Sequence, residues 1–130
     1  KCSSLTSINV VDSGNNNFVS EDGILFSKDK QTIVQYPPGK QETSYTIPDS
    51  VTSIGNNAFY NAIISKVKLP EGLLYVGQSA FRNTKLNEVE IPLSVEYVEN
   101  WAFMNCEELE SITVLGNTQF EWTALPEKNS

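Results

Sequence analysis

Residues 45–61 decide the fold, and they read Tyr-Thr-Ile-Pro-Asp-Ser-Val-Thr-Ser-Ile-Gly-Asn-Asn-Ala-Phe-Tyr-Asn. The first four residues, Tyr45-Thr46-Ile47-Pro48, return at a step of 22 as Val67-Lys68-Leu69-Pro70 and Val89-Glu90-Ile91-Pro92. The same step relates Ala58-Phe59, Ala80-Phe81 and Ala102-Phe103, and also Asn61, Asn83 and Asn105. A fixed period of this length indicates a repeat architecture, in which each unit buries its apolar face only by stacking on its neighbours.

Each repeat contains a strand signal. Apolar Val89 and Ile91 alternate with Glu88 and Glu90, which is the period of a half-buried β-strand. Pro92 ends this strand, because proline has no N–H to donate to a neighbouring strand. We therefore expect a half-buried strand at this position of each repeat, with the glutamates facing solvent.

The Ala-Phe pair of each repeat predicts a short helical or 3₁₀ turn with its phenylalanine inside. We expect Phe59, Phe81 and Phe103 to form one interior column, with successive rungs about 4.8 Å apart. The predicted fold class is a β-rich α/β solenoid of 22-residue repeats with short helical turns.

The chain ends extend the repeat, and one stretch interrupts it. Residues 1–10 align without gaps on residues 105–114, so we assign the repeat array to residues 1–116. Residues 11–41 form one enlarged variant repeat, whose residues 23–36 are typical of a β-hairpin. Residues 117–130 show no repeat phase, and we expect a C-terminal cap or tail there.

The repeat resembles a known family. Its pattern, Ile-Pro-x-x-Val-x-x-Ile-Gly-x-x-Ala-Phe-x-x-Cys-x-x-Leu-x-x-Ile, is that of BspA-like leucine-rich repeats, and residues 47–59 match it at every fixed position. Departures are Ala62 and Thr84 for the cysteine, Glu99 for the glycine and Leu115 for the proline. The resemblance implies a right-handed, curved superhelix in a secreted or surface-anchored protein, mostly bacterial, with an adhesion-type role and no catalytic residues.

Composition excludes several functions. The chain has 130 residues, 39% of them apolar, and 9 Lys+Arg against 16 Asp+Glu, for a net charge of −7. Nucleic acid is therefore not an expected partner, since phosphate binding requires clustered cations. Histidine is absent, which removes imidazole chemistry, and we expect no enzyme, cofactor or catalytic residue. The sequence contains no run of about 18 apolar residues, so it does not predict a membrane-spanning segment.

The outward strand positions are the candidate binding residues. They fall into two ladders, one of Ser7, Ser44, Lys66, Glu88 and Ser111, the other of Asn9, Thr46, Lys68, Glu90 and Thr113. We expect Lys66 beside Glu88 and Lys68 beside Glu90. Solenoid curvature makes such a face an extended concave surface, where a partner binds. The alternative is a solvated face without a ligand.

Tyr75 and Tyr97 share a repeat phase and are expected about one rung apart. An aromatic row of this kind is suited to stacking on a sugar ring, so a carbohydrate ligand is conceivable. Same-face aromatic neighbours also stabilise a sheet by about 0.2–1 kcal/mol per pair, and this structural interpretation is favoured.

The two cysteines and the acidic residues allow further expectations. Cys2 and Cys106 are at least four rungs, or about 19 Å, apart, too far for a disulfide, and we predict both reduced and buried. Residues 12–17 and 21–23 supply oxygen ligands but match no calcium-loop spacing, so no metal site is expected. Eight acids and no Lys or Arg lie between residues 86 and 121. They serve solubility or attract a basic partner or divalent cations.

The function that we favour is protein binding or adhesion by a cell-surface or secreted protein. Its ligand would be a protein, such as a host or cell-surface protein, bound by the polar strand face. One alternative is a carbohydrate-binding surface protein. Another is a purely structural spacer in a longer repeat array.

Overall fold

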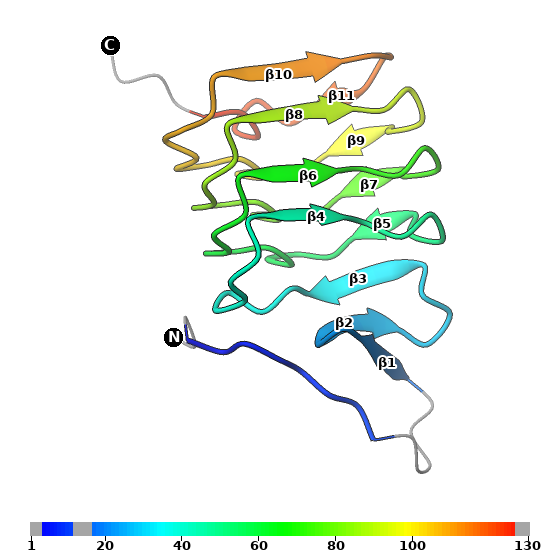
Figure 1. The fold of residues 1–130 in the computed structure, drawn as a ribbon. Coiled ribbons are helices and arrows are strands. Elements are labelled where there is room, and N and C mark those ends of the chain that lie inside the picture. Colours follow the sequence, from blue (N-terminus) through cyan, green and yellow to red (C-terminus); the bar gives the residue numbers. More distant parts are fainter. Residues whose placement is uncertain (1–3, 12–16, 127–130) are drawn as a thin grey trace.

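The structure, a computed structural model of the 130-residue chain, describes residues 4–11 and 17–126. Successive rungs each contribute a strand to two opposite faces, and Figure 1 shows them stacked as a β-solenoid. The first face holds β4 (Ser44–Thr46), β6 (Lys66–Lys68), β8 (Glu88–Ile91) and β10 (Ser111–Val114). The second face holds β5 (Ser53–Ile54), β7 (Tyr75–Val76), β9 (Tyr97–Val98) and β11 (Gln119–Phe120).

Strand pairing follows the 22-residue step. On the first face, β4 pairs in parallel with β6, and β8 pairs in parallel with β10. The two pairs are joined just before β6 and β8, where Asn87 N–H donates to the Ser65 carbonyl (3.1 Å). On the second face, β5, β7, β9 and β11 are consecutive parallel strands of one seven-stranded sheet. The predicted columns are therefore confirmed for these strands.

Aromatic rings fill the centre of the solenoid. Tyr36, Phe59, Phe81 and Phe103 are fully buried, and adjacent ring centroids lie 5.0, 4.9 and 5.5 Å apart. The predicted interior phenylalanine column is therefore confirmed, and Tyr36 extends it by one ring. Burial of a large apolar side chain contributes about 1.5–3 kcal/mol, so this column is a main source of stability.

The turn that carries each phenylalanine is not helical. Consecutive N–H groups alternate between two kinds of acceptor: those of Ala58 and Tyr60 donate to carbonyls three residues back. Those of Asn57 and Phe59 donate to the next rung instead. Every second N–H group of the turn thus donates to the next rung. A helix needs consecutive N–H groups to donate within the same segment, so this turn cannot continue as a helix.

Left-handed residues explain the difference from the predicted helical or 3₁₀ turn. Asn57 and Asn61 have φ of 62° and 66°, and Ser79 and Asn83 repeat this one rung later, with φ of 58° and 63°. A residue in this region interrupts a right-handed helix. The described residues accordingly contain strands and turns but no helix, which corrects the α/β part of the predicted fold class.

Substitution at Asn83 tests this turn geometry. We expect Asn83→Ala to be less stable than Asn83→Gly by about 1–2 kcal/mol, because a side chain with Cβ disfavours the left-handed region and glycine does not. Both variants lose the hydrogen bond that Asn83 donates to Asn61, so their difference isolates the backbone. Urea unfolding measures it, and an alanine variant as stable as the glycine variant would contradict the assignment.

The enlarged repeat adds hairpins to the second sheet. The strand β1 (Phe18–Glu21) pairs antiparallel with β2 (Ile24–Ser27), which pairs antiparallel with β3 (Thr32–Gln35). The strand β3 then pairs in parallel with β5. The hairpin that the sequence predicts over residues 23–36 is therefore present, and it continues the sheet instead of projecting from it (Figure 1).

Both ends of the described chain differ from prediction. Residues 4–11 contain no strand, and Ile8 N–H donates to the Gly23 carbonyl (2.8 Å), so Ser7 and Asn9 do not extend the ladders. Residues 4–11 therefore lie against the inserted hairpin and not against β4, the strand of the following rung. Toward the other end, Phe120 lies in register with Val98. The prediction that residues after 116 have no repeat phase is therefore wrong. Phenylalanine at position 120 occupies the column that holds valine at position 98, so the repeat is not evident from residue types.

Cys106 is buried and free, as predicted. Its Sγ donates to the Phe81 carbonyl (3.0 Å) and lies 3.3 Å from Thr84 Oγ1. Burial raises the pKa of the Cys106 thiol, so the cysteine is structural. Cys2 lies outside the described residues.

Candidate binding surface

The outward side chains of β4, β6, β8 and β10 form one continuous polar surface, which we call the ladder face. Each of these strands turns its apolar side chains to the interior and its polar ones to solvent, because successive side chains alternate. All members are exposed. They are Ser44, Thr46, Lys66, Lys68, Glu88, Glu90, Ser111 and Thr113. Six of the eight residues predicted to bind therefore share this face.

The ladder face is hollowed. A shallow groove of about 390 Å³ crosses all four strands and is lined by every ladder-face residue. Tyr45, Val67 and Val89, whose side chains face the interior, also line it from the intervening strand positions. A groove with polar walls offers both contact area and hydrogen-bonding groups to a ligand.

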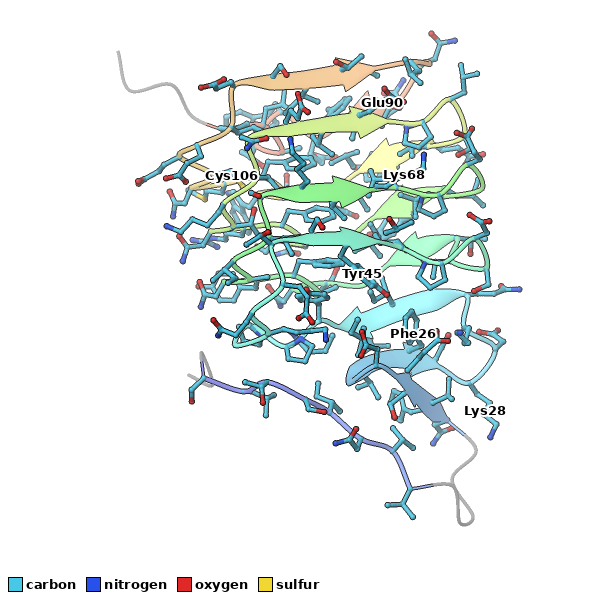
Figure 2. The ribbon with its side chains drawn as sticks, in the orientation of Figure 1. Phe26, Lys28, Tyr45, Lys68, Glu90 and Cys106 are labelled. Carbon is cyan, nitrogen blue, oxygen red and sulfur yellow. The ribbon has the colours of Figure 1, made fainter. Side chains whose placement is uncertain are left out.

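The two expected charge pairs differ. Lys66 Nζ lies 3.4 Å from Glu88 Oε2, and both side chains are more than 60% exposed (62% and 65%). A pair with that exposure contributes at most about 1 kcal/mol to stability. No ion pair joins Lys68 or Glu90 to any described residue, although both line a second hollow of about 180 Å³ with Glu71. Figure 2 shows Lys68 and Glu90 on the adjacent strands β6 and β8.

Tyr75 and Tyr97 lie on the opposite sheet, in β7 and β9, so the structure does not bring them to the ladder face. Their rings stack with centroids 6.2 Å apart and planes inclined by 16°. The Tyr75 hydroxyl donates to Glu99 (2.8 Å), and that of Tyr97 donates to Glu121.

These contacts also affect ionisation. Burial and the hydrogen bond to Glu99 raise the pKa of Tyr75 to about 12. The hydrogen bond to Glu121 is the main reason that the pKa of Tyr97 is raised to about 12. The ring faces that meet in the stack are closed to a sugar ring, and both hydroxyls already have protein partners. The arrangement thus supports the sheet-stabilising interpretation of this pair.

Tyr45 is the groove residue that sequence reasoning missed. It occupies the column of Val67 and Val89, lines the groove and is half-buried, with its ring centroid 5.2 Å from that of the interior Tyr36 (Figure 2). Burial raises its pKa above the ordinary value for tyrosine. The signal was available, because Tyr45 is the aromatic member of an otherwise aliphatic column.

The described residues around β10 and β11 enclose an apolar hollow. A hollow of about 670 Å³ is lined there by Leu109, Ile112 and Phe120, among others, with Glu107 and Glu110 at its margin. Trp122 is 90% exposed nearby in the sequence. Glu107 and Glu110 belong to the acidic stretch between residues 86 and 121.

The described residues contain neither a cluster of metal ligands nor a membrane-spanning helix. No group of three or more His, Cys, Asp or Glu side chains within 4–11 and 17–126 is placed to hold a metal ion. Of residues 12–17, which the sequence offered as oxygen ligands, all but residue 17 lie outside the described part of the chain. In that part, no helix has the length and apolar character to cross a membrane.

Comparison with known proteins gives a family and a fold. The family model described as BspA type leucine rich repeat region matches residues 39–125, in six copies. Among curated proteins, none matches the chain. Solved structures do match.

One such structure is a leucine-rich repeat protein from Eubacterium ventriosum, with 29% identity and a TM-score of 0.82 over 87% of this chain. The pneumococcal vaccine antigen PcpA matches 82% of this chain at 29% identity and a TM-score of 0.66. The chain spans only 31% and 32% of those two proteins. A leucine rich cell surface protein from Faecalibacterium prausnitzii matches 79% of this chain and 41% of its own length, with a TM-score of 0.58. At 18% identity, this last likeness shows the fold alone.

Proposed function

The chain belongs to the BspA-type leucine-rich repeat family, and on that premise we propose that it is a protein-binding, adhesion-type module of a cell-surface or secreted protein. Its ligand is another protein, and the ladder face is the contact surface. One of the similar structures, at 29% identity, is named as a vaccine antigen, which supports a surface location.

The groove across β4, β6, β8 and β10 is the observation that carries this proposal. It presents charged and hydroxyl side chains on a sheet over four consecutive rungs. Rigid solenoid faces of this kind make extended binding surfaces. Presenting the side chains in fixed columns also reduces the ordering that binding requires.

Binding is favoured over catalysis on this face. A carboxylic acid catalyst needs an environment that raises its pKa, such as an apolar pocket. Glu88 and Glu90 are instead exposed to solvent along an open surface. Carbohydrate binding is less favoured because the stacked faces of Tyr75 and Tyr97 cover each other.

A protein array tests the proposed function. The chain is labelled and applied to purified extracellular-matrix and cell-surface proteins, and we expect saturable binding to at least one of them. The variant Lys68→Ala/Glu90→Ala should lose most of that binding. The matched control Lys85→Ala/Glu107→Ala removes the same charges from exposed positions outside the groove and should bind normally.

Two results would overturn the proposal. One is the absence of saturable binding to any protein of the array, which would favour a structural spacer. The other is equal loss of binding in both double variants, which would place the contact outside the ladder face.

A further inference from the structure

The ladder face has an ordered charge pattern from one end of the array to the other. It runs from hydroxyls on β4, through ammonium groups on β6 and carboxylates on β8, to hydroxyls on β10. The pattern is present twice, since each strand carries two outward residues. Opposite charges thus lie on adjacent rungs about 4.8 Å apart, and like charges lie two residues apart along one strand.

One half of this pattern is satisfied within the protein and the other half is not. Lys66 and Glu88 form an ion pair (3.4 Å), whereas Lys68 and Glu90, at the equivalent positions two residues later, form none with a described residue. Both unpaired groups line the groove. The groove therefore offers one ammonium and one carboxylate group to a ligand, side by side.

Resting on the proposed function, we propose that the ladder face recognises an extended, mixed-charge segment of its protein partner, with an acidic side chain over β6 and a basic one over β8. The segment lies across the strands, along the axis of the solenoid. Side chains on one side of an extended chain repeat at about 6.6 Å, which is twice the strand rise. Lysine and glutamate side chains are long enough to absorb the difference from the rung spacing.

The same geometry disfavours segments of a single charge. A polyacidic segment that contacts Lys66 and Lys68 also brings its carboxylates onto Glu88 and Glu90. A polybasic segment that contacts Glu88 and Glu90 likewise brings its cationic groups onto Lys66 and Lys68 of β6. Like-charge contacts of this kind are unfavourable and suppress wrong partners.

An extended ligand fits the groove better than a helix does. A helix with its side chains is about 10–12 Å across, whereas the groove is a shallow depression of about 390 Å³ on a sheet. A depression of that size accepts side chains from a chain lying over it.

Synthetic peptides test the inference with a defined probe. Three fluorescent peptides of equal length carry repeats of Glu-Thr-Lys-Thr, Glu-Thr-Glu-Thr or Lys-Thr-Lys-Thr. By fluorescence anisotropy at low ionic strength, we expect the mixed peptide to bind at least about tenfold more tightly than either single-charge peptide. Equal binding of a single-charge peptide, or no binding of any of the three, would overturn the inference.

Charge variants extend the test. Lys66→Glu/Lys68→Glu makes the face acidic and should transfer the preference to the lysine peptide. The matched control Arg82→Glu/Lys85→Glu makes the same change in net charge outside the groove and should keep the preference for the mixed peptide. Exchanging all four charges, by adding Glu88→Lys and Glu90→Lys to the first variant, should restore mixed-peptide binding. Failure to restore it in a folded variant would contradict the proposed pattern.

The outcomes separate the two proposals. Saturable binding on the protein array without mixed-peptide preference would leave the adhesion function standing and refute the charge pattern. Mixed-peptide preference without any array partner would support the charge pattern and count against the adhesion function.

Discussion

Replacing Phe81 with alanine should lower the free energy of unfolding by about 3–5 kcal/mol, as for other buried phenylalanine truncations. Phe81 is fully buried and stacks on Phe59 on one side and on Phe103 on the other, with centroids 4.9 and 5.5 Å away. Truncation removes two ring contacts and leaves a cavity in the middle of the column. The rungs cannot close this cavity without breaking the hydrogen bonds that join them, such as that from Phe81 N–H to the Ala102 carbonyl.

Urea unfolding measures this loss, and Lys66→Ala is the control. Lys66 is exposed and forms one surface ion pair, so its truncation should cost less than about 0.5 kcal/mol. The contrast between the two variants distinguishes the interior column from the ladder face. Similar midpoints for both would contradict the assignment of faces.

The sequence predicted the columns because a repeat determines its own register. When one unit packs on the next, residues 22 apart must align, so Phe59, Phe81 and Phe103 had to share a column. Alternation in Leu86–Ile91 then assigned Glu88 and Glu90 to the outside. Both inferences depend on period alone, and both agree with the structure.

Period alone could not give the backbone path between strands. The turn at Ala58-Phe59 alternates its hydrogen bonds between its own rung and the next. That choice depends on Asn57 and Asn61 entering the left-handed region. Asparagine tolerates this region better than most residues, but its presence at two positions does not by itself exclude a short helix.

The candidate site was predicted in part for the same reason. Repeat phase identifies which residues share a column, so the ladder-face residues were grouped correctly. Phase does not show whether two columns share a face, and Tyr75 and Tyr97 lie on the other sheet. Nor does phase show that Lys66 and Glu88 pair whereas Lys68 and Glu90 do not, since this depends on side-chain conformation.

Replacing Tyr36 with phenylalanine should raise the free energy of unfolding, by about 1–3 kcal/mol. Tyr36 is fully buried at the end of the aromatic column, and its hydroxyl has no hydrogen-bond partner among the described residues. Leaving a buried hydroxyl without a partner costs about that amount relative to its hydrated state in the unfolded chain. Phenylalanine keeps the ring, which stacks on Phe59 at 5.0 Å, and removes the uncompensated group. A destabilised variant would show that the hydroxyl is hydrogen-bonded in solution.

The pH dependence distinguishes this cause from a change in ring packing. Burial, with smaller effects from Glu42 and Asp22, raises the pKa of Tyr36 from 10.0 to about 12 in the folded protein. Between these pH values the unfolded chain loses the proton and the folded chain keeps it, so the stability contributed by the neutral tyrosine falls as pH rises. Tyr36→Phe has no such proton, and apart from Tyr45, whose pKa Tyr36 helps to raise by a smaller effect than burial, the tyrosines have no titration linked to Tyr36. The advantage of the variant, measured by urea unfolding, should therefore be constant below pH 10 and increase toward pH 12. A constant difference throughout would instead attribute the effect to packing.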